Sequence, residues 1–220
     1  MGHAHTLAAV LYFAAMAAVF ARDVATVQAY SNDCITLASE HGFAQWAAHG
    51  RILQGWADAQ KGEAMTGIAR IRDSLAAIEA TGTRIFAPFY LALLAEALAL
   101  AGKIEEGLAT LDNALAQAAV SGEKGWDAEI HRLRGELTGR LPYPDPAQAE
   151  DSFRTALAIA REQGTRGYEL RAATSLARLW GEQGRRGEAR DLLAPVYGWF
   201  TEGFDTADLK EARRLLDELS

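Results

Sequence analysis

The 220-residue chain is half hydrophobic and carries a formal net charge of −7, with a single cysteine. The acidic balance argues against binding to nucleic-acid backbones, and the lone Cys34 excludes an intrachain disulfide and favours a reducing, cytoplasmic compartment. The chain contains only five prolines, so long uninterrupted helices are possible.

The first predicted element is a helix over residues 7–21, a run without one charged side chain. The run is short for a membrane span, and the MGHAHT before it lacks the Lys or Arg of a signal peptide. We therefore expect a buried helix and no membrane association. A helix that is apolar all round needs cover on every side. We expect upstream repeats of a longer parent chain, or a second copy in a homodimer, to cover what its neighbours leave open.

After this helix, a glycine followed four residues later by an aromatic recurs along the chain. The four pairs, spaced by 40, 40 and 42 residues, are Gly42…Trp46, Gly82…Phe86, Gly122…Trp126 and Gly164…Tyr168. A fixed period of this size is typical of stacked-repeat proteins. Each glycine is expected to end a helix in the left-handed conformation. We interpret the aromatics as rings that pack between consecutive repeats, rather than as a strip that stacks a ligand.

One repeat shows the expected unit clearly. Residues 86–101 and 104–120 predict two helices, separated by a turn at Gly102, and together form a helix–turn–helix of about 40 residues. Small residues recur inside the first helix of every unit and predict the points where paired helices touch. They are Ala15, Gly55, Ala95, Gly135 and Ala177.

The sequence thus predicts an all-α, right-handed tetratricopeptide-like solenoid forming a single domain over residues 1–220. Five helical hairpins are expected to start near residues 7, 46, 86, 126 and 168, followed by a capping helix over 206–219. Two extra residues fall in the turn that contains Pro142–Pro146, where Asp145 is a good N-cap and Pro146 a good first helical residue.

In tetratricopeptide repeats the first helices line the concave face. Mapped onto this chain, that face grades from apolar to charged, which suits an amphipathic peptide or a neighbouring domain. The alternative is an ordinary solvated surface with internal salt bridges such as Arg132–Glu136. The groove candidates are His49, Ile52, Trp56, Gln60, Phe89, Glu96, Glu129, Arg132, Glu136, Arg171 and Arg178.

No arrangement of residues predicts catalysis. The pair His3 and His5 is interpreted as part of a frayed terminus rather than as a metal site. Cys34 lacks a His or Asp placed to activate it, so it is interpreted as a buried packing residue rather than as a nucleophile. We therefore expect a protein that is not an enzyme and needs no cofactor and no metal.

The stretch from Glu169 to Ser220, with the phrases SLARLW and LLAPVYGWFTEGFDTADL, resembles the C-terminal end of large bacterial signalling proteins. Two earlier phrases, GFAQWAAHGRILQGWA and FYLALLAEALALAGKIEEGL, resemble it more weakly. Those proteins carry a class III adenylate/guanylate cyclase-like or winged-helix domain, then a STAND/AAA-type ATPase, then a long tetratricopeptide tail. The resemblance implies a regulatory tail. Because the glycine-rich phosphate-binding loop of such ATPases does not occur here, none of their nucleotide chemistry carries over.

The leading functional hypothesis is therefore a non-catalytic protein-interaction or sensor module. The alternative is a solenoid that binds a small effector in its concave groove near Trp56, His49 and Gln60. An enzyme with its site between repeats would need converging titratable groups, and the sequence pattern shows none.

Overall fold

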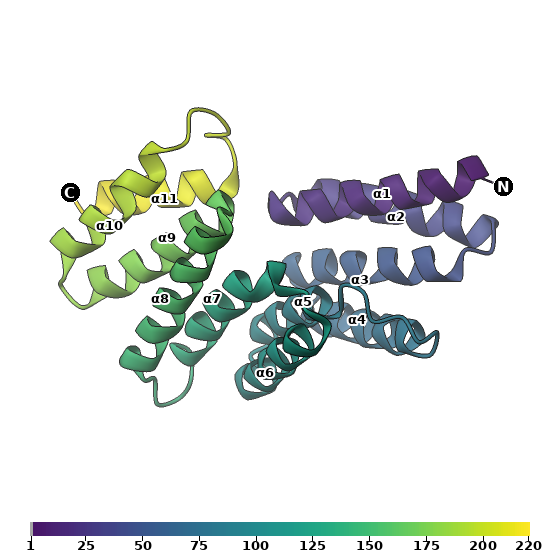
Figure 1. Ribbon diagram of the computed structural model, residues 1–220, viewed down its shortest axis with the longest axis horizontal. Helices are drawn as coiled ribbons and strands as arrows, with labels where there is room; N and C mark the ends of the chain where they lie inside the picture. Colours follow the sequence, from purple (N-terminus) through teal and green to yellow (C-terminus); the bar gives the residue numbers. More distant parts are fainter. Residues whose placement is uncertain (1) are drawn as a thin grey trace. The chain divides into compact units, whose positions relative to one another are not determined.

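The computed structural model describes residues 2–220 and confirms the predicted fold class. Within these residues the chain forms eleven α-helices and one short 3-10 helix, without a β-strand, and successive helices pair into hairpins (Figure 1). The chain divides into two compact units, one up to Thr110 and one from Leu111 onward, and the two are described separately. The predicted single domain over 1–220 stays a prediction.

The first unit consists of two complete hairpins and the start of a third. The first helix of each hairpin packs beside the first helix of the next, so that α1, α3 and α5 lie in a row. The second helices α2 and α4 each pack against their own first helix and against the next one. The bounds are α1 (Gly2–Phe20), α2 (Val24–Glu40), α3 (Ala44–Gln60), α4 (Ala64–Glu79), α5 (Ala87–Leu100) and α6 (Ile104–Ser121), and the unit boundary falls inside α6.

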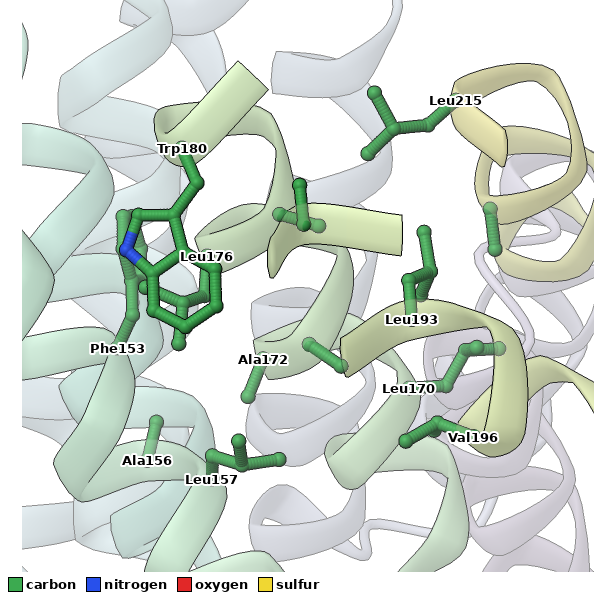
Figure 2. Close-up of a cluster of buried hydrophobic side chains, with 14 of the residues drawn as sticks. Phe153, Ala156, Leu157, Leu170, Ala172, Leu176, Trp180, Leu193, Val196 and Leu215 are labelled. Carbon is green, nitrogen blue, oxygen red and sulfur yellow. The ribbon is translucent and has the colours of Figure 1, made fainter. Parts of the chain in front are cut away.

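The second unit repeats this arrangement. Helix α7 pairs with α8 and α9 pairs with α10, while α7, α9 and α11 form the row of first helices. The bounds are η1 (Lys124–Trp126), α7 (Asp127–Thr138), α8 (Pro146–Gln163), α9 (Arg166–Glu182), α10 (Arg186–Gly198) and α11 (Ala207–Glu218). Figure 2 shows the core between these helices, with the Phe153 ring of α8 beside Trp180 of α9 and with Leu193 of α10 and Leu215 of α11 pointing inward.

The predicted helix ends are confirmed by the backbone. The four ladder glycines Gly42, Gly82, Gly122 and Gly164 have φ between 67° and 79°, a conformation that L-residues with a Cβ adopt at a cost. The turns inside the hairpins also contain a glycine with positive φ, such as Gly62 at φ 95°. The first hairpin departs from it, because Arg22 occupies the equivalent turn position at φ 55°.

The small residues inside the helices are also contact points, as predicted. A Cβ added to Gly55 of α3 would lie 2.8 Å from the carbonyl oxygen of Gly67 in α4, and one added to Gly135 of α7 would lie 2.6 Å from the Phe153 ring. Such separations are below van der Waals contact, so the paired helices can approach this closely only with glycine at these positions.

The turn that holds the two extra residues is confirmed as the connection between α7 and α8. The Asp145 carboxylate accepts hydrogen bonds from the backbone N–H groups of Ala147 at 3.0 Å and Gln148 at 3.1 Å, and α8 begins at Pro146.

At the other end of the unit, α11 buries Leu209, Ala212 and Leu215 against α9 and α10. This confirms the predicted apolar stripe of the capping helix.

Helix α1 differs from the prediction in its start. It begins at Gly2 rather than near residue 7, because nothing in the preceding residues breaks a helix. One of its sides packs against α2 and α3, and the rest of its apolar surface is not fully covered. By length and composition alone, residues His3–Phe20 could cross a membrane, a test that core helices and signal sequences also pass.

Candidate interaction surfaces on the first helices

The row of first helices in the second unit carries a ladder of ion pairs centred on Arg132. The Arg132 side chain, 7% exposed, donates from Nε to Glu129 Oε2 at 2.9 Å and from Nη2 to Glu129 Oε1 at 2.8 Å. Its remaining Nη1 lies 3.0 Å from Glu136 Oε1. This bidentate geometry is the strong form of an arginine–carboxylate contact, and the predicted Arg132–Glu136 salt bridge is confirmed.

The ladder continues from α7 through α9 to α11. Arg171 Nε donates to Asp208 Oδ2 at 2.7 Å, and Arg171 Nη1 lies 3.5 Å from Glu129 Oε1. Burial alone would lower the pKa of Arg171, but the carboxylates of Glu129 and Asp208 raise it above its usual value. Farther along the same helices, Arg178 pairs with Glu211. We call this set Glu129, Arg132, Glu136, Arg171, Arg178, Asp208 and Glu211 the charge ladder.

The structure thus joins four of the five groove residues predicted for the second unit through ion pairs, while the fifth, Arg178, pairs separately with Glu211. Sequence reasoning missed Asp208 and Glu211, although a signal existed, since they follow Tyr168 and Arg171 by the 40-residue period. The ladder has three arginines and four carboxylates, so its charges are largely matched within the chain. Only its outer members Glu136, Arg178 and Glu211 are substantially exposed, at 34%, 33% and 41% of the side chain.

On the corresponding face of the first unit, most of the predicted groove side chains are buried and do not reach solvent. His49, Ile52, Trp56 and Phe89 are each at most 4% exposed. The Trp56 indole N–H donates to Glu96 Oε2 at 2.6 Å, and Arg22 lies 3.7 Å from the same carboxylate. The structure therefore places four of the six candidates of this unit in the interior, because bulky rings fill the space between neighbouring first helices. Gln60 and Glu96 are partly exposed. Whether any of these residues binds a partner stays a prediction.

A row of hydrogen-bonded side chains, which sequence reasoning missed, joins the first helices α1, α3 and α5. The hydroxyl oxygens of Tyr12 in α1 and Tyr90 in α5 are 2.7 Å apart, and Tyr90 Oη lies 2.7 Å from His49 Nδ1 in α3. All three residues are nearly inaccessible to solvent. Burial lowers the pKa of His49 to about 4, so the imidazole is neutral at pH 7. Burial also raises the pKa of Tyr12. These buried hydrogen bonds are suited to holding α1, α3 and α5 in fixed positions relative to one another.

The packing interpretation of the aromatic ladder is confirmed for its first two members. The Trp46 ring lies 5.7 Å from Tyr12 and 6.4 Å from Phe13, and the Phe86 ring lies 6.1 Å from Tyr12. Both rings therefore rest on α1. His5 is not frayed, since its Nε2 accepts the Trp46 indole N–H at 3.0 Å.

Cys34 is buried, as predicted. Its thiol lies 3.4 Å from the carbonyl oxygen of Ala8, and burial raises its pKa to about 11, which makes it a poor nucleophile. Across residues 2–220, the structure shows no cluster of three or more His, Cys, Asp or Glu side chains that could hold a metal ion.

The side of α1 that α2 and α3 leave only partly covered is an apolar stripe open to solvent. Leu7, Val10 and Phe13 are 41%, 56% and 45% exposed, and the stripe continues through the exposed Ala17. These residues follow the three- and four-residue spacing of one helix face. The expectation that neighbouring helices cover α1 only in part is therefore confirmed, and the α1 stripe is a second candidate interaction surface.

Comparisons with known proteins bear on the fold and not on a particular activity. No protein-family model matches the chain. An uncharacterized protein of Rhizobium meliloti is 30% identical over 179 residues, which is 81% of this chain but 17% of the relative, so the chain matches only a small part of that protein.

Among solved structures, a Rap protein complexed with competence and sporulation factor gives a TM-score of 0.70 at 16% identity, covering 97% of this chain and 57% of that one. Kinesin-light-chain TPR-like repeats of Podosopora anserina give a TM-score of 0.59 at 16% identity, covering 90% of this chain and 96% of that one. These likenesses show that the chain has the fold of tetratricopeptide-like repeat proteins.

Proposed function

We propose that the chain is a non-catalytic, protein-binding repeat segment of a longer cytoplasmic signalling protein. The α1 stripe is the observation that carries the proposal. Leu7, Val10 and Phe13 form a contiguous apolar surface of the kind that marks a contact with another polypeptide, while Ala8, Tyr12 and Ala15 on the other side of α1 are buried. In a repeat protein, the surface beside a first helix is where the preceding hairpin stacks. The occupant we propose is therefore a preceding hairpin of the parent chain.

Two further observations support this proposal. The matched stretch makes up only 17% of the Rhizobium meliloti relative, so repeats of this kind occur within a much longer chain. The resemblance of residues 169–220 to the tails of cyclase-like and STAND-type ATPase regulators suggests a signalling parent. The Rap structure, whose complex contains a competence and sporulation factor, supports binding of a protein or peptide partner by this fold. The exposed end of the charge ladder, at Glu136, Arg178 and Glu211, is the place we propose for that partner.

The parent chain can be tested directly in source cells. An antibody raised against the 220-residue chain should detect a protein much larger than the chain itself on a denaturing gel. Detection of a single species of about the size of the chain would overturn the parent-chain proposal.

The partner proposal needs its own measurement. The double variant Glu136→Lys/Arg178→Glu, introduced into the same cells, should lose a partner that the wild-type protein captures by crosslinking. A surface variant away from the ladder, Arg51→Glu, is the control. Equal capture by all three proteins would exclude the ladder as the contact.

The small-effector alternative receives less support. Trp56 and His49, its central residues, are buried and hydrogen-bonded to Glu96 and Tyr90. A thermal-shift screen with sugars and nucleotides tests this alternative, since a ligand that raises the melting temperature would favour it.

A further inference from the structure

Helix α11 occupies the place of a first helix in a sixth hairpin. It packs against α9 as α9 packs against α7, and Glu211 follows Arg171 by the 40-residue period. In the same register, Asp217 stands where the preceding first helices carry Gly55, Gly135 and Ala177. The face of α11 that contains Asp217 is therefore equivalent to the face that contacts the second helix in other hairpins.

The chemistry of this face differs from that of its equivalents. In α3 and α7 the equivalent glycines permit contact so close that a Cβ would clash. In α11 the same face carries Asp217 and, two turns earlier, Lys210 in the register of Ala48 and Ala128. A helix packed as closely as in the other hairpins would bury both charged side chains at a high cost. The α11 face is thus suited to an occupant other than a repeat helix.

A hollow of about 660 Å³ lies on this face. Its size falls within the range of ligand-binding pockets. It is lined by Tyr197, Phe204, Leu209, Lys210, Arg213, Arg214 and Asp217. Tyr197 near the end of α10 and Phe204 in the α10–α11 connection form one wall of the hollow, and α11 forms the other. The connection is the loop above α10 and α11 in Figure 1. We call it the C-terminal hollow.

The C-terminal hollow combines an aromatic wall with a net positive charge. The rings of Tyr197 and Phe204 lie 6.0 Å apart, and Phe204 is 47% exposed. Arg213 Nε donates to the Asp217 carboxylate at 3.2 Å, and the Tyr197 hydroxyl together with Asp217 raises the pKa of Arg213. This pairing leaves the charges of Lys210 and Arg214 to dominate the hollow. Arg214, 70% exposed, pairs with Glu218 at a long distance of 3.9 Å.

We propose that the C-terminal hollow binds a short acidic peptide segment of a partner protein, with one apolar side chain placed between Tyr197 and Phe204. Lys210 and Arg214 are one helical turn apart, a rise of about 6 Å, so they match two successive carboxylates better than one small anion. A membrane or a nucleic acid would bring a broad anionic surface against Glu202 and Asp205 in the α10–α11 connection, whereas a short peptide can place its carboxylates at Lys210 and Arg214 alone. A peptide with its own apolar anchor therefore fits better than either.

This site is separate from the charge ladder and from the α1 stripe, and it does not depend on the function proposed above. The test is selection of a random short-peptide phage library on the full chain, followed by fluorescence anisotropy of the selected peptides at low and high salt. We expect peptides that carry paired acidic residues beside an aromatic or aliphatic residue, with binding that weakens as salt rises.

Variants assign the peptides to the hollow. Both Lys210→Glu/Arg214→Glu and Phe204→Ala should weaken binding about tenfold or more, while Arg190→Glu, an exposed charge change on α10 outside the hollow, should not. Circular dichroism checks that each variant remains folded. The proposal is overturned if no selected peptide depends on these residues. It is equally overturned if vesicles containing phosphatidylserine bind the chain through them and no peptide does.

Discussion

The hydroxyl oxygens of Tyr12 and Tyr90 lie 2.7 Å apart, joining helices whose residues are 78 positions apart in the chain. Tyr90 also contacts His49 Nδ1, so its hydroxyl is the central member of a buried hydrogen-bonded chain. Removing a central hydroxyl leaves polar atoms on both sides short of a partner, which is more costly than removing a terminal one.

We therefore predict that Tyr90→Phe lowers the free energy of unfolding by about 1–3 kcal/mol, and that Tyr12→Phe lowers it less. Urea unfolding followed by circular dichroism measures both. Tyr143→Phe is the matched control, because Tyr143 is 93% exposed and its change should be close to neutral. If the two buried variants behave like this control, the hydroxyl chain does not contribute to stability.

His49 predicts a pH dependence of stability. Its pKa is about 4 in the folded chain, below the usual value of 6.5 for an unfolded histidine. The unfolded state therefore binds a proton more readily, and stability falls as the pH drops from about 6.5 toward 4. His49→Gln should flatten this part of the stability profile relative to the wild type, whereas the exposed His41→Gln should not. Parallel profiles for all three proteins would contradict the assignment.

The turn at Arg22 predicts a stabilising substitution. A left-handed non-glycine residue costs roughly 1–3 kcal/mol, and Arg22→Gly removes this strain. The gain is reduced by the greater freedom of glycine in the unfolded chain and by loss of the exposed contact with Glu96. We expect a net gain of about 0.5 kcal/mol in thermal or urea unfolding. Gly62→Ala, at φ 95°, should lose about 1 kcal/mol. A loss in both variants would show that the Arg22–Glu96 contact matters more than the backbone.

The charge ladder predicts that its buried arginine is important for stability. Arg132, which is only 7% exposed, is the bidentate partner of Glu129 and also pairs with Glu136, and Arg132→Leu removes both ion pairs. We expect a loss of about 2 kcal/mol, because Glu129, whose side chain is 15% exposed, loses its bidentate partner and keeps the longer contact with Arg171. Arg72→Leu breaks the exposed pair with Glu106 and should change the stability by less than about 1 kcal/mol. Equal effects in urea unfolding would mean that burial does not strengthen the ladder.

The α1 stripe predicts self-association when the chain is produced alone. In the absence of a preceding hairpin, a second copy is the available cover for Leu7 and Val10, so light scattering should report a dimer at high concentration. Leu7→Glu/Val10→Glu should give a monomer, while Met65→Glu, a comparable change at an exposed apolar residue of α4, should not. A wild-type chain that stays monomeric would refute this prediction.

Most of the fold could be predicted because the 40-residue period marks backbone requirements. Gly42, Gly62 and Gly164 stand where the chain needs a positive φ, and Gly55 and Gly135 stand where helices approach closely. Such requirements restrict the residue type at a single position, so they are visible in one sequence.

The site was harder to predict because it depends on what fills the space between helices. Tyr12, Ile52 and Ala92 occupy equivalent positions, so no periodic signal marks the Tyr12–Tyr90 contact. The 40-residue period places the groove candidates on the first helices of the two units, but the large rings of the first unit close the face there, while Glu136 and Arg178 of the second unit remain partly exposed. Asp208 was missed because it stands, one 40-residue period after Tyr168, where the earlier repeats carry an aromatic residue.

The turn between α7 and α8 shows where this chain tolerates change in length. Its two extra residues lie between Thr138 and Pro146, and the helices on both sides keep their pairing. Tyr143 in this turn is almost fully exposed, and lengthening such a connection costs only about 0.6 kcal/mol for each doubling. The turn is therefore a suitable insertion point for a fluorescent or affinity reporter. Such a reporter could follow binding at the charge ladder or at the C-terminal hollow without altering the helices that form these surfaces.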